Sequence, residues 1–329
     1  MNRPIFILGC TKSGTTLMRN LFDSYPGLFV LPLESHFFQS IRRWVDYYFR
    51  RTMPRKLNFE EMKEGLFQHI KFVNSRTNLK ADAFTENMWD LEKVKKTLDS
   101  TPVKNLRELS DLYVQVIHQN FYGGMPDPTS EFVEKSVENA EFAFEWSTIY
   151  PEARFIRILR NPYSNIVSIR RHIQRKSKRY PFMKPAVYSM YNSYWHMYKN
   201  RNLLKNHKIV IYDELIQRPE KVMREVADFL GVPFKESLIQ PSFLGEPWGG
   251  NSQTGKKFTK ISPTVLNRWK KEITHLEIHL VNDWFDFVLK DYGFKKIDAH
   301  KRACYPVKNE GLRTYFLNRM LIKYMPDLA

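Results

Sequence analysis

The sequence predicts an α/β protein with a P-loop-like central parallel sheet flanked by helices. Three observations support this fold class: short apolar runs bounded by polar or turn residues, amphipathic segments that follow most of them, and a glycine-containing loop after the first run. Near-continuous apolar runs are typical of strands buried in a parallel sheet. Strands that alternate with helices indicate βαβ units, whose ligands bind beyond the carboxyl ends of the strands.

The individual elements follow from these runs. Strands are expected at Pro4–Cys10, Phe132–Lys135, Ala153–Leu159 and Lys208–Tyr212, with Leu28–Leu33 as a fifth candidate. Helices are expected at Thr15–Ser24, Pro162–His172 and Pro219–Leu230. Proline is favoured in the first turn of a helix, as at Pro162, and Gly231 stands where a helix C-cap is expected.

The chain of 329 residues is long enough for one large domain or two small ones. Residues about 38–128 interrupt the strand–helix alternation and are helix-rich, aromatic and basic, which predicts a helical insertion. Residues about 296–329 form a basic and aromatic C-terminal extension. We therefore expect residues 1–329 to form a single domain that carries this insertion and this extension.

The formal net charge of +17 predicts a polyanionic partner, but charge alone does not choose among nucleotides, sulfated acceptors, nucleic acid and anionic lipid. The two cysteines, Cys10 and Cys304, do not make a disulfide framework.

No run approaches the roughly 18 apolar residues of a membrane helix. The apolar run Ile5–Cys10 lacks a signal-peptide cleavage site, so a cytoplasmic location is predicted and peripheral membrane attachment stays open.

A phosphate-binding loop is predicted between the first strand and the first helix, at Lys12, Ser13, Gly14, Thr15 and Thr16. The first N–H groups of a helix lack partners within it, and with the helix dipole they form an anion site. The glycine permits a positive φ and close approach of a ligand. The three hydroxyl groups are hydrogen-bond donors, and the lysine adds a full positive charge.

This loop departs from the ATP-binding motif G-x-x-x-x-G-K-[ST]. Gly9 and Gly14 match its two glycines and Thr16 matches its Ser/Thr position, but Thr15 stands where lysine is required. The usual site that reaches the β- and γ-phosphates beside Mg²⁺ is therefore absent. A nucleotide with a single 5′-phosphate and a sulfate would need no such metal site.

The segment Ile5–Leu17 resembles the 5′-phosphosulfate loop of the PAPS-dependent sulfotransferases, where PAPS is 3′-phosphoadenosine 5′-phosphosulfate. Its continuation to Pro26 is similar to the Golgi-type and bacterial branch, which includes the tyrosylprotein sulfotransferases. The segment Arg157–Ser168 resembles the second signature of this family. The resemblance implies that Arg160 and Ser168 bind the 3′-phosphate of PAPS.

Two later segments extend the resemblance. Ile209–Leu215 resembles the segment of the family that places Tyr212 at the nucleotide, although a core tyrosine is an equal alternative. Asn267–Lys271 resembles the segment that ends the cofactor loop, with Asn267 where glycine is common. Lys257 and Lys260 precede it and are candidates to close over the nucleotide.

The resemblance implies in-line transfer of the sulfuryl group from PAPS to a hydroxyl or amine of an acceptor, with the bisphosphate PAP as product. Lys12 would stabilise the leaving phosphate, and a general base would accept the proton of the acceptor. Glu34 is the candidate base, on a match that needs a one-residue shift, and His36 is its rival. Lys135 would contact the transferring group or form a structural ion pair.

No cluster of His, Cys and Asp has metal-ligand spacing, so no metal is expected. The alternatives are a P-loop kinase, which would need a lysine after Gly14, and a non-catalytic basic nucleotide- or polyanion-binding protein. The run Arg170–Arg179 superficially favours nucleic acid, but such a run is more commonly a solvated helix end, and no nucleic-acid partner is predicted.

The acceptor is not readable from the sequence; a carbohydrate, a lipid-linked sugar, a peptide and a small alcohol all fit, and the insertion is expected to build its pocket. The oligomeric state is equally open. The stretch Leu312–Met325 mixes apolar residues with Arg313, Arg319 and Lys323. It is predicted to pack on its own domain, with a membrane or a partner subunit as alternatives.

Overall fold

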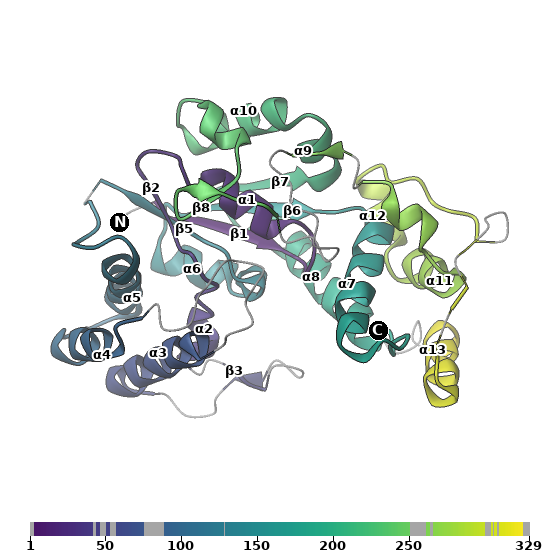
Figure 1. Ribbon diagram of the computed structural model, residues 1–329, viewed down its shortest axis with the longest axis horizontal. Helices are drawn as coiled ribbons and strands as arrows, with labels where there is room; N and C mark the ends of the chain where they lie inside the picture. Colours follow the sequence, from purple (N-terminus) through teal and green to yellow (C-terminus); the bar gives the residue numbers. More distant parts are fainter. Residues whose placement is uncertain are drawn as a thin grey trace. The chain divides into compact units, whose positions relative to one another are not determined.

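The computed structural model describes residues 3–41, 44–46, 51–52, 57–75, 89–127, 129–250, 261–263, 266–299, 304, 306–307 and 309–324. Within these residues the central sheet has five strands in the order β2-β5-β1-β6-β7 (Figure 1). Both β1 and β2 pair in parallel with β5, with Ile5 opposite Val133 and Leu28 opposite Glu131. The predicted fold class is confirmed. The strands are β1 (Ile5–Gly9), β2 (Leu28–Val30), β5 (Glu131–Glu134), β6 (Arg154–Leu159) and β7 (His207–Ile211).

Helices follow the strands as the sequence predicts, with three differences at element ends. Helix α1 ends at Phe22, two residues before the expected Ser24. Helix α7 runs past the expected end at His172 because no helix breaker intervenes, and it stops where Lys178 adopts a left-handed conformation with φ of 55°. Tyr212 was expected to end a strand but is the first residue of a helix. These helices are α1 (Thr15–Phe22), α7 (Pro162–Ser177), α9 (Tyr212–Gln217) and α10 (Pro219–Leu230).

The described part of the predicted insertion consists mainly of helices. Helix α3 begins with a capping box, in which Asn58 and Glu61 each accept a hydrogen bond from the backbone N–H of the other. Helix α4 packs against both α3 and α5 (Figure 1). A short antiparallel pair, β3 and β4, was not expected. The elements are α2 (Phe37–Ser40), β3 (Trp44–Asp46), β4 (Arg51–Thr52), α3 (Phe59–Asn74), α4 (Leu91–Ser100) and α5 (Leu106–Phe121).

The remaining elements are helices, 3₁₀ turns and one further pair of strands. In the ranges that the structure describes, no helix combines the length and the apolar character needed to cross a membrane. Two further short strands, β8 (Ser242–Phe243) and β9 (Glu246–Pro247), pair antiparallel. The helices are α6 (Ala143–Ile149), α8 (Lys184–Leu203), α11 (His275–Trp284), α12 (Asp286–Asp291) and α13 (Leu312–Tyr324), with 3₁₀ turns at Val137–Ala140, Glu236–Ile239 and Arg268–Lys271.

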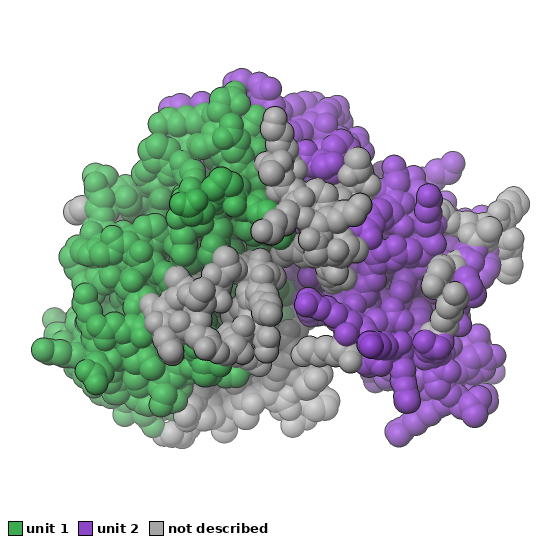
Figure 2. Space-filling view, in the orientation of Figure 1, with its two compact units in different colours: residues 1–7, 16–155, 235–259 green, residues 8–15, 156–234, 260–329 purple. Residues whose placement is uncertain are grey.

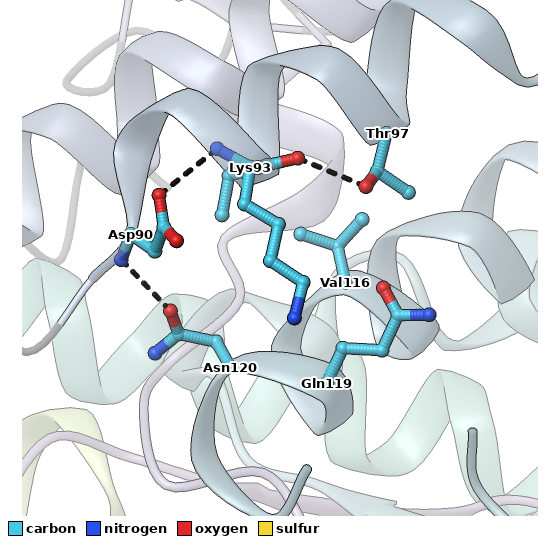
Figure 3. Close-up of a pocket in the computed structure, with 7 residues that line it drawn as sticks. Asp90, Lys93, Thr97, Val116, Gln119 and Asn120 are labelled. Carbon is cyan, nitrogen blue, oxygen red and sulfur yellow. Dashed lines mark hydrogen bonds between the residues drawn. The ribbon is translucent and has the colours of Figure 1, made fainter. Parts of the chain in front are cut away.

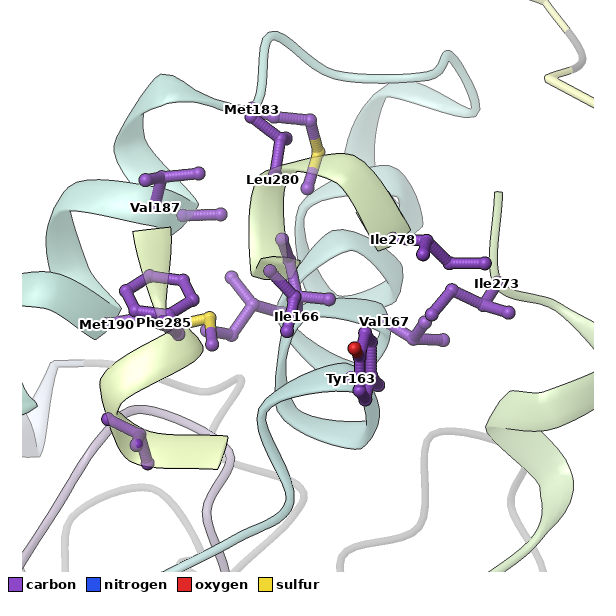
Figure 4. Close-up of a cluster of buried hydrophobic side chains, with 14 of the residues drawn as sticks. Tyr163, Ile166, Val167, Met183, Val187, Met190, Ile273, Ile278, Leu280 and Phe285 are labelled. Atoms are coloured by element: carbon purple, nitrogen blue, oxygen red, sulfur yellow. The ribbon is translucent and has the colours of Figure 1, made fainter. Parts of the chain in front are cut away.

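The chain divides into two compact units (Figure 2). Unit 1 comprises Met1–Ile7, Thr16–Phe155 and Lys235–Thr259, and unit 2 comprises Leu8–Thr15, Ile156–Phe234 and Lys260–Ala329. In unit 1, Phe6 stacks on Trp146 at 4.5 Å between ring centroids. In unit 2, side chains of α7, α8, α11 and the residue that follows α11 meet in one buried cluster, which includes Ile166, Met190 and Phe285 (Figure 4). The single-domain organisation stays a prediction.

The reading of Arg170–Arg179 as a solvated helix end is wrong for its first two residues. Arg170 is buried, and its Nε donates to Oε1 of the fully buried Glu277 at 2.6 Å. Arg171 forms an ion pair with Glu272. The cause is the packing of α7 against α11, which covers the arginines and supplies carboxylates that the local sequence does not reveal. Removing either Arg170 or Glu277 would leave an uncompensated buried charge.

Candidate active site

The phosphate loop belongs to unit 2 as far as Thr15 and has an unusual backbone. The N–H of Ser13 donates to the carbonyl of Cys10 at 3.0 Å, which closes a tight turn after β1. Lys12 has φ of 63° and Gly14 has φ of 109°. A positive φ is uncommon for a residue other than glycine, and such strain clusters at ligand-binding sites. Because α1 begins at Thr15, the first N–H groups of that helix have no partners within it.

Side chains pack closely around this turn. A Cβ atom on Gly9 would lie 2.6 Å from Oγ of Ser13, and one on Gly14 would lie 2.3 Å from the ring of Tyr212. Ser13 is only 1% exposed, and its Oγ has no hydrogen-bond partner among the described residues. A buried hydroxyl without a partner is rare, and an anionic ligand in this loop would supply the missing acceptor. The loop therefore fits an oxyanion.

Arg160 joins the loop to the start of α7. It follows β6, and its guanidinium donates to Oγ of Ser164 at 2.9 Å, to the carbonyl of Lys12 at 2.8 Å and to Oγ of Ser168 at 3.5 Å. It also lies 4.8 Å from the ring centroid of Tyr212. The structure thus brings together Arg160, Ser168, Tyr212 and the loop. Ser164 was not foreseen, although its position one helical turn before Ser168 could have suggested it.

Asn165 is a second contact that the sequence did not reveal. Its Nδ2 donates to the carbonyl of Thr11 at 2.9 Å, and its Oδ1 is buried without a partner among the described residues. Residues 11 and 12 are therefore each held through their carbonyl groups by side chains that lie near the start of α7. These two contacts fix the backbone of the turn that precedes Gly14.

Replacing Gly14 by alanine is expected to destabilise the fold by about 2–5 kcal/mol and to block the binding of an oxyanion in the loop, because it combines a strained positive φ with a clash against Tyr212. Chemical denaturation and titration calorimetry would measure the two effects. Gly27→Ala is the matched control, since Gly27 also has a positive φ but no atom within 4 Å of the added Cβ. Equal losses in both variants would contradict the role of close packing.

The predicted catalytic residues Glu34, His36 and Lys135 form a cluster in unit 1. Nζ of Lys135, which directly follows β5, forms an ion pair with Oε1 of Glu34. Nε2 of His36 lies 3.4 Å from Oε2 of Glu34, and Nδ1 lies 3.0 Å from Oε2 of Glu138. The Lys135 side chain is only 5% exposed, whereas that of Glu34 is 30% exposed. The structure therefore shows the ion pair that was one of the two alternatives for Lys135. The partner of Lys135 in this pair is Glu34, the predicted base.

The carboxylate of Glu134 connects the two chain segments that carry this cluster. It is 1% exposed and accepts hydrogen bonds from the N–H and Oγ of Ser35 at 3.1 and 2.8 Å, from Ser136 and from Asn139. Burial raises the pKa of Glu134, and these donors partly oppose the rise. The segment that carries Glu34 is thus fixed to the segment that carries Lys135. An acidic residue at the end of a buried strand was the available sequence signal.

Two helices of the insertion hold the same segment by its main chain. Nε2 of His69, on α3, donates to the carbonyl of Glu34 at 3.2 Å, and the hydroxyl of Tyr113, on α5, donates to the carbonyl of Ser35 at 3.4 Å. Burial, with the charge of His36, lowers the pKa of His69 to about 4, so this ring is neutral at physiological pH. The insertion therefore positions the candidate base, a role that the sequence did not indicate.

The protonation states within the cluster follow from burial and charge. Burial alone would lower the pKa of His36, but the hydrogen bond to Glu138 and the charges of Glu138 and Glu34 raise it to about 9. Burial would raise the pKa of Glu34, but Lys135 and His36 outweigh it and the pKa is lowered. At neutral pH the cluster therefore holds an ionised Glu34 between two cations. His36 is thus a weak candidate for the base.

The elevated pKa of His36 predicts a pH-dependent stability. Its value in the folded state is about 9, against 6.5 ordinarily, so the stabilisation is complete below about pH 6.5 and disappears as the pH rises through 9. We expect His36→Gln to remove about 2–3 kcal/mol of unfolding free energy at pH 6 and much less at pH 10. Urea denaturation at the two pH values would test this, and a loss that is equal at both would contradict it.

Glu34, His36 and Glu138 place ligand atoms within 4.8 Å of one another, as a metal site would require. Sequence spacing did not reveal this group because Glu138 comes from a distant segment. Its carboxylates already face the ammonium of Lys135 and the imidazolium of His36. A cation would have to displace both, so the donor set fits an internal ion-pair network better than a metal.

Two predicted residues, Lys257 and Lys260, lie outside the described residues. The segment 266–299 is described, and Trp269 in it stacks on Tyr163 with 5.8 Å between ring centroids.

A small pocket opens between α4 and α5, lined by Asp90, Lys93, Val94, Thr97, Val116, Gln119 and Asn120 (Figure 3). None of the predicted site residues lines it.

Comparison with known proteins bears on the fold and the family of this chain. Among solved structures, the sulfotransferase domain from the curacin biosynthetic pathway matches with a TM-score of 0.53 and 17% identity, covering 98% of each chain. The sulfotransferase domain of the Synechococcus PCC 7002 olefin synthase matches with a TM-score of 0.49 and 18% identity, covering 98% of this chain and 96% of that chain. No curated protein sequence matches. The family model described as "Sulfotransferase family" matches residues 4–236, and the chain therefore belongs to the sulfotransferase family.

Proposed function

We propose that this protein transfers the sulfuryl group of PAPS to a hydroxyl or amine of an acceptor. The observation that supports the proposal is that Arg160 connects two candidate anion-binding elements. Arg160 donates both to the carbonyl of Lys12, in the first element, and to Ser168, in the second. PAPS presents two anionic groups, a 5′-phosphosulfate and a 3′-phosphate, which match two such elements.

The first element would hold the 5′-phosphosulfate. Its candidates are the N–H groups at the start of α1, the unpartnered Oγ of Ser13 and the charge of Lys12. The second would hold the 3′-phosphate through the fork of Arg160 and the hydroxyl of Ser168. Tyr212 packs against Gly14 and under Arg160, so it shapes both elements. Burial raises the pKa of Tyr212, which keeps its phenol neutral.

Bound PAPS would supply a sulfuryl group on a good leaving phosphate. As the bond between sulfur and the bridging oxygen breaks, negative charge develops on that oxygen, and Lys12 would stabilise it. Glu34 would accept the proton of the acceptor, because it is ionised at neutral pH and 30% exposed. Lys135 and His36 orient its two oxygens. The Golgi-type branch stays a prediction.

Adenosine 3′,5′-bisphosphate, the product PAP, is expected to raise the melting temperature in the absence of Mg²⁺. A ligand at 100 times its Kd adds about 2.7 kcal/mol to the free energy of unfolding. Differential scanning fluorimetry in EDTA would measure the shift. We expect adenosine 5′-phosphate, which lacks the 3′-phosphate, to give a much smaller one.

Two results would overturn the proposal. One is stabilisation by ATP with Mg²⁺ but not by PAP, which would indicate kinase-like binding. The other is equal stabilisation by PAP and by inorganic sulfate at the same concentration, which would indicate a general polyanion site. A positive PAP result would then justify screening acceptors with labelled PAPS, beginning with carbohydrates, peptides and small alcohols.

A further inference from the structure

Helix α13 exposes a continuous apolar stripe. Leu312, Phe316 and Met320 are 79%, 62% and 53% exposed. Residues four apart in a helix lie on one face, so the three side chains follow one another along α13. Large apolar side chains that are exposed singly are ordinary, but a contiguous row is typical of a binding surface.

The opposite side of the helix is fixed to unit 2. Leu321 and Asn318 are buried, and α13 packs against α11. Oδ1 of Asn318 accepts a hydrogen bond from the N–H of Met183 at 2.8 Å, and its Nδ2 donates to the carbonyl of Pro181 at 3.1 Å. The predicted packing of this segment on its own domain is thus observed for one side only. The stripe faces outward because the other side is anchored.

Basic residues share this outward side. Arg313, Arg319 and Lys323 are exposed, and α13 contains no Asp or Glu. Arg319 lies 3.8 Å from Glu310, before the helix, and stacks over Tyr315. We call the side formed by Leu312, Arg313, Phe316, Arg319, Met320 and Lys323 the outer face of α13. It alternates apolar and cationic side chains.

We propose that the outer face of α13 binds the surface of an anionic membrane, with the helix lying in the plane of the interface. A helix with basic and large apolar residues on its exposed side is suited to this position, since the apolar groups enter the acyl boundary and the cations meet lipid phosphates. The net charge of +17 favours the same approach. A nucleic acid would leave the apolar stripe in water, and a second copy of this face would bring cations against cations.

The experiment is co-sedimentation of the whole protein with vesicles. Binding is expected to vesicles that mix phosphatidylcholine with phosphatidylserine, and to be much weaker with phosphatidylcholine alone. We expect Phe316→Ser to weaken the partition coefficient by about tenfold and Arg313→Gln by about fivefold. Matched controls are Phe144→Ser, at a side chain that is 49% exposed, and Lys96→Gln, at an exposed lysine on α4; neither should change binding.

Each other outcome would overturn the proposal. Equal loss in the control variants would show that binding follows total charge or total apolar exposure. Loss with Arg313→Gln but not with Phe316→Ser would indicate a polyanion site. A dimer that Phe316→Ser converts to a monomer in light scattering, without vesicle binding, would show that a second copy covers the face. An unchanged melting temperature confirms that each variant is folded.

Discussion

Glu34→Gln is expected to lower the rate of sulfuryl transfer by about 10²- to 10⁴-fold while PAP binding is retained. Glutamine keeps the shape of the side chain but cannot accept the proton of the acceptor. Steady-state kinetics with an acceptor found by the screen, together with PAP calorimetry, would separate the effect on rate from the effect on binding. Because the change leaves Lys135 without its carboxylate partner, some loss of stability should accompany it.

Glu138→Gln is the matched control for this variant. Glu138 contacts His36 and not Glu34, so it acts through the imidazole and its replacement should cost much less in rate. The control should lower the pKa of His36, which has lost its nearest carboxylate, and NMR titration of the ring would show this. Unchanged turnover in Glu34→Gln would dismiss Glu34 as the base. Equal rate losses in both variants would show that the rate depends on the whole ion-pair cluster and not on Glu34 as the base.

Arg160→Ala is expected to weaken PAP binding by about 100-fold. The change removes the charged, forked donor proposed to bind the 3′-phosphate beside Ser168. It also removes the hydrogen bond to the carbonyl of Lys12 in the phosphate loop. Arg160→Lys should restore little of the affinity, because an ammonium cannot donate to both Ser164 and Lys12 in the same geometry. Titration calorimetry with PAP would measure both losses.

Arg224→Ala provides the comparison for Arg160. Arg224 is an exposed arginine of α10 in the same unit, and its guanidinium pairs only with Glu220 of its own helix among the hydrogen bonds of the described chain. Its removal lowers the net charge by the same amount and should leave PAP affinity nearly unchanged. If the two alanine variants lost affinity equally, the binding of PAP would depend on overall charge and not on the geometry at Arg160.

The fold class could be predicted because its signals are local. A buried parallel strand needs an apolar run whatever lies beside it, and the helices begin and end at residues such as Pro162 and Gly231 whose backbone preferences are intrinsic. The end of α7 could not be placed, because no glycine or proline lies between His172 and Lys178, and the left-handed conformation of Lys178 has no sequence signal. The sheet order likewise depends on contacts between distant segments.

The candidate site divides in the same way. The phosphate loop was predictable because a glycine and hydroxyl residues between a strand and a helix bind anions through their own backbone. Glu134, Glu138 and His69 were missed because each becomes important only when distant segments meet. The misreading of Arg170 has the same origin, since its partner Glu277 lies in another helix.

The hydrogen bonds from His69 and Tyr113 to the carbonyls of residues 34 and 35 have an evolutionary consequence. Every residue type has a main-chain carbonyl, so these bonds constrain the insertion and not the segment it holds. The exposed positions of α3 and α5 can therefore change without affecting these contacts, provided that a donor remains at each of the two points. Substitutions at those points would instead remove the support of the backbone that carries the candidate base.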